Sequence, residues 1–338
     1  MGPLPKVLLL MPGRMFERAF TAAHVERLAR SCDLVRPLPC TSLDDPALAD
    51  ALRHIEIVVT GWATPRLDGA AVARLPALRL LAHVGGSVKP VIDPGLLGAG
   101  IRVTSATAAN ARPVAEYTLA FILLENKGVA EWARRYRARR SRIELGPHSQ
   151  SATLGNAGRI VGVVGASHVG RCLMGFLKNF DLRVLVCDPY LSAEAASALG
   201  AELCPLQDLL RQSDVVTLHA PALPSTRHMI GAAELALMRD GSLLINTARG
   251  EIVDHDALAA ELGRGRLRAV LDVTDPEPLP DGSPLFDLPN VILTPHIAGS
   301  LGNEIHRLTV LMLTEIERFL DTGTLLHEIR RENWETVA

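Results

Sequence analysis

Short apolar runs alternate with segments of helical periodicity through the first hundred residues. The runs are rich in β-branched and aliphatic residues, and their length predicts buried strands. They are Val7–Met11, Ile57–Thr60, Leu80–His83 and Arg102–Ser105. Between them, Ala22–Arg30 and the shorter Ala70–Arg74 carry apolar residues at helical spacing. Alternating strands and helices predict a parallel sheet that is covered on both faces.

The second half of the chain repeats this alternation with six more apolar runs. They are Ile160–Val164, Val184–Cys187, Val215–Leu218, Leu243–Asn246, Ala269–Asp272 and Val291–Thr294. Each of the later runs follows a helical or turn segment. Six parallel strands built from two mononucleotide-binding halves form the doubly wound architecture that binds dinucleotides.

The first of these six strands leads directly into a glycine turn, Gly165–Gly170, and then into a helical pattern. Gly165 permits the tight turn, Gly170 permits close packing of helix and strand, and N–H groups at the helix start can hold a pyrophosphate. The next strand ends at Asp188, where such folds hydrogen-bond the adenosine ribose. Ser167 replaces the middle glycine. An ordinary βα turn is the alternative, but strand, turn, helix, strand and terminal Asp together favour the dinucleotide site.

Two helical segments flank this nucleotide unit in the sequence. Asn110–Leu124 is predicted as the helix that leaves the first domain, with Pro113 in its first turn. Asn303–Leu320 has apolar residues at helical spacing and is predicted as a second long helix. The polar segment Gly146–Gly158 is predicted as a hinge-like approach to the nucleotide unit.

An arginine-rich stretch, Trp132–Arg142, follows the first of these helices. A solvated face is the leading interpretation, a subunit contact is the second, and nucleic-acid binding is a distant third.

Composition and charge limit the class of protein. The chain has 338 residues, 48% of them hydrophobic and 21% charged, which is typical of a globular protein with room for two cores. A net charge of -2 gives no overall attraction to nucleic acid or to an anionic membrane. Its apolar runs are too short to span a bilayer, and residues 1–5 lack a signal-peptide pattern, so we expect a cytoplasmic protein.

Cysteine usage agrees with that compartment. The five cysteines are scattered and contain no C-x-x-C pair, which predicts buried reduced thiols rather than disulfides or a zinc site. They are Cys32, Cys40, Cys172, Cys187 and Cys204.

Polar residues with catalytic chemistry follow the last three predicted strands. Arg249, Glu277 and His296 come just after the carboxyl ends of these strands, at the edge where such folds place ligands. Each one alone is read as an ordinary surface or structural residue. Together, a guanidinium, a carboxylate and an imidazole opposite a bound nicotinamide form a reaction centre for reducing a keto acid. In the first domain, the turn at Gly86 and Ser87 is either a carboxylate-binding turn or a purely structural one.

These motifs resemble the D-isomer-specific 2-hydroxyacid dehydrogenase family, which includes glyoxylate/hydroxypyruvate reductases, D-lactate dehydrogenases and phosphoglycerate dehydrogenases. The resemblance covers nearly the whole chain and is most specific in the block that ends at Asp254. The segments that carry it are Ala111–Glu116, Val161–Gly170, Leu218–Pro221, Leu244–Asp254, Asp272–Pro278 and Thr294–Gly299.

The resemblance implies a role for each residue of the reaction centre. Arg249 would hold the carboxylate and keto oxygen of the substrate, His296 would be the proton donor, and Glu277 would be its partner. Asp272 would lie by the carboxamide of the nicotinamide. When hydride reaches C2, the charge that develops on the keto oxygen would be stabilised by Arg249 and neutralised by the His296 imidazolium.

The resemblance also implies the binding residues. His168 and Val169 would present backbone groups to the pyrophosphate. Cofactor-binding residues would be Thr118, Gly165, His168, Val169, Gly170, Asp188, Ala220, Pro221, Thr247, Ala248, Arg249, Asp272, His296 and Gly299, and substrate-binding residues would be Gly86, Ser87, Arg249 and His296. Asp188 favours NAD, because it accepts from a free 2′-hydroxyl and repels a 2′-phosphate. Ser167 and the pair Lys89-Pro90 depart from the family pattern and bear on cofactor geometry and on substrate identity.

The implied fold is α/β with two doubly wound parallel-sheet domains. A Rossmann NAD-binding domain (112–302) would be inserted into a discontinuous, flavodoxin-like substrate-binding domain (1–111 and 303–338). A homodimer and ligand-driven closure are expected. The alternative function is an NAD-sensing, corepressor-like binding protein. Formate dehydrogenases share the fold but would lead us to expect glutamine at Glu277.

Overall fold

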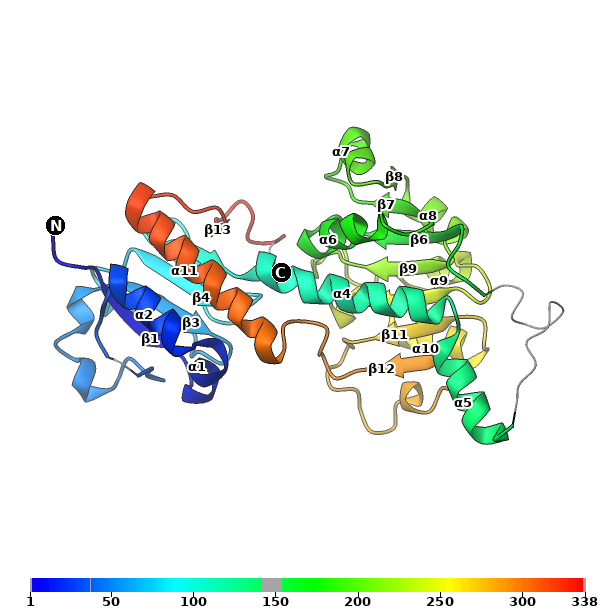
Figure 1. Cartoon of the computed structure of the whole chain (residues 1–338), viewed down its shortest axis with the longest axis horizontal. Helices are drawn as coiled ribbons and strands as arrows, with labels where there is room; N and C mark the ends of the chain where they lie inside the picture. Colours follow the sequence, from blue (N-terminus) through cyan, green and yellow to red (C-terminus); the bar gives the residue numbers. More distant parts are fainter. Residues whose placement is uncertain (1, 37, 142–153, 337–338) are drawn as a thin grey trace. The chain divides into compact units, whose positions relative to one another are not determined.

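The computed structural model describes residues 2–36, 38–141 and 154–336, and Figure 1 shows the order of their elements. The chain divides into two compact units. The first unit consists of Met1–Asn110 and Ser300–Ala338, and the second of Ala111–Gly299. None of the described helices combines the length and the hydropathy needed to cross a bilayer.

The first unit contains a sheet with the strand order β13-β5-β4-β3-β1-β2. Its strands are β1 (Lys6–Leu10), β2 (Asp33–Leu34), β3 (Ile55–Gly61), β4 (Leu80–Val84), β5 (Arg102–Ser105) and β13 (Glu328–Ile329). The four strands predicted from apolar runs are present within two residues of the expected bounds. The expected parallel sheet is confirmed, and an additional short strand, β13, pairs antiparallel with β5 at one edge. A two-residue strand has no apolar period that a sequence pattern can detect.

Two hydrophobic layers cover the two faces of this sheet, as the alternating pattern predicted. On one face, α1 (Gly13–Ala19), α2 (Ala22–Ser31) and α11 (Ile305–Thr322) pack over the strands, and Figure 1 shows α11 running beside α1 and α2. The other face packs against α3 (Gly69–Ala73) and surrounding loops. The 3-10 turns of this unit are η1 (Pro46–Leu48), η2 (Leu52–His54), η3 (Pro94–Leu96) and η7 (Gly302–Glu304).

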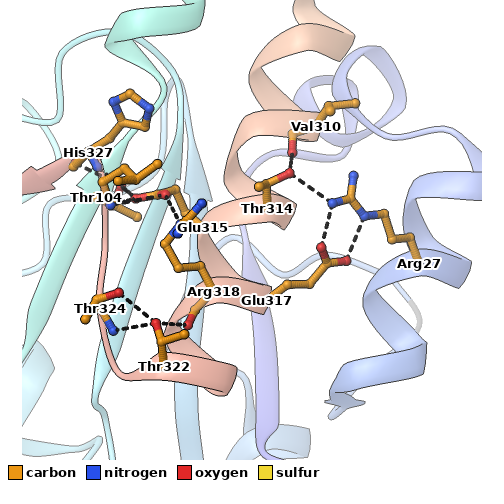
Figure 2. Close-up of polar contacts among 11 residues, drawn as sticks. Arg27, Thr104, Val310, Thr314, Glu315, Glu317, Arg318, Thr322, Thr324 and His327 are labelled. Carbon is orange, nitrogen blue, oxygen red and sulfur yellow. Dashed lines mark hydrogen bonds and ion pairs between the residues drawn. The ribbon is translucent and has the colours of Figure 1, made fainter.

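A buried carboxylate joins α11 to the C-terminal strand segment (Figure 2). The side chain of Glu315 is 1% exposed, and its Oε2 accepts hydrogen bonds of 2.9 Å from the backbone N–H groups of Leu326 and His327. The Thr104 hydroxyl of β5 donates to the His327 carbonyl at 2.9 Å. These bonds hold the segment that leads into β13 between α11 and β5.

In the second unit, the described residues form a seven-stranded sheet with the order β12-β11-β10-β9-β6-β7-β8, and every pair is parallel. Its strands are β6 (Arg159–Val164), β7 (Leu182–Cys187), β8 (Glu202–Leu203), β9 (Val215–Leu218), β10 (Leu243–Asn246), β11 (Arg268–Leu271) and β12 (Val291–Leu293). All six predicted strands are present. The expected number was one too low, because β8 is again only two residues long.

Helices cover both faces of this sheet as well. One face packs against α4 (Thr107–Glu125), α6 (His168–Leu177) and α7 (Ala193–Ala198), and the other against α8 (Leu206–Gln212), α9 (Ala232–Leu237) and α10 (His255–Gly263). The remaining elements are α5 (Val129–Arg139), η5 (Gly250–Ile252) and η6 (Pro284–Phe286). The strand order reverses between β6 and β9, which is the switch point where doubly wound sheets bind ligands at the carboxyl ends of their strands.

The start of helix α4 differs from the prediction. It begins at Thr107, so Pro113 lies inside the helix and not in its first turn. The carbonyl of Ala106 accepts from the N–H groups of Ala109 and Asn110 and so starts the helix before the proline. Proline lacks only its own N–H, and the helix continues through the buried residues on either side of it.

The arginine-rich stretch forms α5 and the residues after it. Its described arginines are exposed to solvent, as the leading interpretation predicted, and Glu131 pairs with Arg134 at 2.6 Å and with Arg135. Arg142 and most of the predicted hinge segment Gly146–Gly158 lie outside the described residues.

The five cysteines are free thiols. Their expected burial holds for Cys32 and Cys40, whereas Cys172, Cys187 and Cys204 are half-buried. Burial raises the pKa of the Cys32 thiol to about 11, which makes it a poor nucleophile.

Candidate active site

Both glycines of the dinucleotide turn are required by the local geometry. Gly165 has φ +99°, and a Cβ there would lie 2.6 Å from the backbone nitrogen of Ala220. A Cβ on Gly170 would collide with the carbonyl oxygen of Gly165. The turn, the start of α6 and the end of β9 therefore pack backbone against backbone, as the sequence predicted.

Ser167, which stands at the middle glycine position, is the N-cap of α6. Its φ of −63° and ψ of 179° suit any residue, so the departure from glycine causes no strain. Its hydroxyl accepts the N–H of Gly170 at 3.5 Å. His168 and Val169 are the first two residues of α6, and the start of a helix attracts anions through its N–H groups and its dipole. The residues present therefore fit a pyrophosphate at this helix start.

Asp188 follows β7 and holds the same turn. One carboxylate oxygen accepts the N–H of Ala166 at 2.7 Å, and the other accepts that of Tyr190 at 2.8 Å. The carboxylate is half-buried and each oxygen keeps capacity for a further hydrogen bond. This geometry is compatible with the ribose contact that the sequence predicts.

Two threonines from separate elements contact each other near the carboxyl end of β10. Thr118 of α4 is fully buried, and its hydroxyl lies 3.2 Å from that of Thr247, which follows β10. Asn246, the last residue of β10, is also fully buried. Its side-chain amide donates to the Arg249 carbonyl at 2.8 Å and accepts from the Ala248 N–H at 3.0 Å. Asn246 thereby shapes the turn that presents Arg249.

The side chain of Arg249 is half-buried. Its guanidinium donates to the Ala248 carbonyl at 2.6 Å. Burial lowers the pKa of Arg249 from its usual value, and the negative charges of Glu277 and Glu251 oppose that effect. A guanidinium remains charged under these conditions, so the chain holds a partly desolvated cation close to Glu277.

His296 and Glu277 form a hydrogen-bonded pair. The Nδ1 of His296 lies 2.7 Å from Oε1 of Glu277, and the two side chains are 52% and 43% exposed. They come from the segments after β12 and β11, which end at the same edge of the sheet. Because Glu277 engages Nδ1, the opposite ring nitrogen, Nε2, is the one available to a substrate.

Asp272 fixes the backbone around His296. It is 2% exposed. Its Oδ1 accepts from the Thr294 hydroxyl at 2.6 Å and the Ile297 N–H at 2.8 Å, and its Oδ2 accepts from the Ala298 N–H at 2.9 Å. Its backbone carbonyl accepts the N–H of His296, a residue held at φ +54°. Oδ2 keeps room for one more bond, so the predicted carboxamide contact remains chemically possible.

The predicted carboxylate-binding turn lies in the first unit, directly after β4. Thr107 donates to the Gly86 carbonyl at 2.8 Å. His83 is fully buried beneath the turn, 2.9 Å from the Thr60 hydroxyl, and a Cβ on Gly85 would collide with its ring. The ammonium of Lys89 donates to the Glu335 carbonyl at 3.0 Å, so in this structure it engages the C-terminal segment.

The structure therefore brings Arg249, Glu277 and His296 to one edge of the second unit. Thr247, which follows β10, contacts Thr118 of α4, and Asp272 binds the backbone after His296. Sequence reasoning did not identify the supporting roles of Asn246 and Asp272. A polar residue at the end of an otherwise apolar strand is the signal that could have indicated them. Gly86 and Ser87 belong to the other unit.

Comparisons with known proteins show the family to which the chain is similar. Residues 119–298 match the family model described as D-isomer specific 2-hydroxyacid dehydrogenase, NAD binding domain. A D-3-phosphoglycerate dehydrogenase of Mycobacterium leprae is 33% identical over 76% of the chain, which spans only 48% of that relative's length. An (S)-sulfolactate dehydrogenase of Chromohalobacter salexigens is 33% identical over 88% of this chain and 95% of its own. A phosphoglycerate oxidoreductase structure from Rhizobium etli matches 97% of the chain and 99% of its own, with 26% identity and a TM-score of 0.82.

Proposed function

The chain belongs to the D-isomer specific 2-hydroxyacid dehydrogenase family, and from this premise we propose that it interconverts a small 2-keto acid and its D-2-hydroxy acid with NAD(H). NAD is the cofactor that the matched domain indicates. The observation that carries the proposal is the His296–Glu277 pair, 2.7 Å apart, together with the half-buried Arg249, whose guanidinium interacts electrostatically with Glu277. A proton donor and an anion-stabilising group are what carbonyl reduction requires.

Each residue of this site has a defined task in the proposed reaction. Arg249 binds the carboxylate and the keto oxygen, where its charge stabilises the developing alkoxide. Glu277 orients the imidazole through Nδ1, and His296 donates a proton from Nε2 to that oxygen. Bound NADH supplies the hydride. For oxidation of the hydroxy acid, the neutral imidazole takes the proton back.

The cofactor would lie along the edge formed by the predicted residues of the second unit. His168 and Val169 would hold the pyrophosphate, Asp188 the ribose, and Asp272 the nicotinamide carboxamide. The substrate carboxylate would also receive N–H groups from Gly86 and Ser87. The domain limits 112–302, the homodimer and the cytoplasmic location remain predictions from the sequence.

The preferred keto acid is best sought among those that the names of relatives suggest. The panel contains glyoxylate, pyruvate, hydroxypyruvate, 3-phosphohydroxypyruvate and sulfopyruvate, and the readout is loss of NADH absorbance. We expect turnover with at least one of them.

The control is His296→Ala, which should bind NADH with near-normal affinity but lose about 10² to 10⁴ of the rate, the usual contribution of a positioned general acid. Near-normal turnover of this variant would remove His296 from the mechanism. NADH binding without turnover on any keto acid would favour the corepressor-like alternative.

A further inference from the structure

A hydrogen-bond chain connects α4 to the loop that carries His296. The hydroxyl of Tyr117, on α4, lies 2.6 Å from that of Thr294, and the Thr294 hydroxyl donates to Oδ1 of Asp272 at 2.6 Å. Asp272 then accepts the N–H groups of Ile297 and Ala298 through its side chain. The three linked side chains therefore end on the residues directly after His296.

The direction of this chain follows from counting protons. A threonine hydroxyl has one proton to donate, and that of Thr294 is used by the Asp272 carboxylate. The contact between the two hydroxyls must then be a donation from Tyr117 to Thr294. A donor at the head of the chain polarises the next hydroxyl and strengthens its bond to the carboxylate.

Tyr117 is suited to be a fixed donor. Its ring packs against Phe121 of the same helix, with ring centroids 4.8 Å apart. Burial raises the pKa of Tyr117 above its usual value, so the phenol keeps its proton throughout the neutral range. Without the phenol, Thr294 could rotate its hydroxyl towards other acceptors.

The geometry points to Tyr117 as a positioning residue for His296, acting through Thr294 and Asp272. This inference rests on the proposed function, because it concerns the placement of the proposed proton donor. Tyr117 does not touch the imidazole. It orders the carboxylate that accepts the backbone N–H groups of Ile297 and Ala298, the two residues after a histidine held at positive φ. A small displacement of such a donor costs rate more than it costs cofactor binding.

The central variant is Tyr117→Phe, which removes one hydroxyl and keeps the ring. We expect kcat for keto-acid reduction to fall about 5- to 10-fold, the scale of one internal hydrogen bond, while KM for NADH stays within about twofold. Because proton donation becomes slower relative to hydride transfer, the solvent isotope effect on kcat should rise. Tyr136→Phe is the matched control, since Tyr136 lies on α5 with 60% exposure.

Variants of Thr294 test whether the hydrogen-bond chain from Tyr117 to Asp272 acts as a unit. Thr294→Val should reproduce the loss, and combining it with Tyr117→Phe should add little, because both break the same connection. Thr294→Ser keeps a hydroxyl and should restore kcat to within about twofold of the parent. If the losses of kcat from Tyr117→Phe and Thr294→Val are additive, the two residues do not act through one hydrogen-bond chain, and the inference is overturned.

Amide hydrogen exchange at residues 296–298 gives a readout that does not depend on turnover. In Tyr117→Phe these amides should exchange about 5- to 10-fold faster than in Tyr136→Phe, as expected for losing one internal hydrogen bond. If these amides exchange faster in Tyr117→Phe but the parent protein reduces no keto acid, the proposed function is refuted. The hydrogen-bond chain from Tyr117 to Asp272 would still hold the loop. Unchanged exchange with an unchanged kcat and solvent isotope effect in an active enzyme would overturn the role of Tyr117.

Discussion

Glu277 and His296 are each more than two-fifths exposed, so their 2.7 Å contact is screened by water and modest in strength. Its importance is chemical, because the contact fixes the orientation of the ring and places a negative charge beside the proton donor. In Glu277→Gln the amide can still orient the ring, but the charge is lost. We expect reduction at subsaturating keto acid to fall about tenfold at neutral pH, on the scale of a hydrogen bond to a charged group.

The pH dependence of the two reaction directions tests the role of His296 as proton donor. Reduction consumes a proton and oxidation releases one, so in the parent enzyme reduction should decline with rising pH while oxidation of the hydroxy acid improves. Initial rates in both directions measure this, and profiles that are flat in both directions would contradict the assignment of His296.

Asp188 is the residue that should decide between NADH and NADPH. Its carboxylate accepts the N–H groups of Ala166 and Tyr190, so it is held at the edge where the ribose is expected. A 2′-phosphate placed there would meet a fixed negative charge, which is worth about 1–4 kcal/mol at about 4 Å near a protein surface. The ratio of kcat/KM should favour NADH by about tenfold or more, and Asp188→Ala should reduce that ratio. Equal efficiency with both cofactors would remove Asp188 as the discriminator.

At the scale of a single element, α11 offers a comparison between two of its own carboxylates. Glu315 is 1% exposed and binds two backbone N–H groups, whereas Glu317 is 40% exposed and pairs with Arg27 at 2.6 Å (Figure 2). Glu315→Ala would leave both N–H groups without their acceptor inside the protein. It should lower the free energy of unfolding by about 1–3 kcal/mol.

Glu317→Ala is the control on the same helix, and its cost should be about 1 kcal/mol or less because the pair is partly solvated. Trp62 and Trp334 belong to the first unit and Trp132 to the second, so denaturant unfolding followed by tryptophan fluorescence in a Trp132→Phe background reports on the first unit. If the two variants lose the same free energy of unfolding, then Glu315 holds the C-terminal segment on α11 no more strongly than an exposed carboxylate would.

For the whole molecule, one buried histidine in each unit predicts how stability depends on pH. Burial lowers the pKa of His83 to about 4 and that of His219 to about 3, from a usual value of 6.5. Each ring is neutral when folded, whereas the unfolded chain takes up a proton below about pH 6.5. Stability should therefore be full above pH 6.5 and fall as the pH drops towards 4 in the first unit and towards 3 in the second. The loss from His83 alone is about 3 kcal/mol.

Denaturant unfolding at pH 7.5, 6, 5 and 4 measures this dependence. His83→Gln should flatten the curve of the first unit between pH 6.5 and 4, even if its stability at pH 7.5 is lower. An unchanged slope in that variant would mean that other groups cause the acid sensitivity.

The sequence by itself determined the strands of this protein, its dinucleotide turn and the sheet edge that carries the candidate site. Apolar runs such as Val215–Leu218 and Leu243–Asn246 are strands with the predicted bounds, because strands buried on both faces must be apolar throughout. Gly165 and Gly170 are required for steric reasons that any such turn shares. Since all strands of the second sheet are parallel, residues that follow their carboxyl ends must share one edge, and this places Arg249, Glu277 and His296 together.

Only the tertiary structure decided how these side chains are held. The two-residue strands β8 and β13 take their conformation from neighbouring strands and carry no pattern of their own. Pro113 lies inside α4 because the buried faces around it continue the helix. Asp272 finds its side-chain partners 22 to 26 residues away. Glu315 accepts from residues 11 and 12 positions away and from Thr104, 211 positions away, and Tyr117 meets Thr294 across 177 residues. A buried polar group must be satisfied, but which distant residue satisfies it is fixed only when the chain has folded.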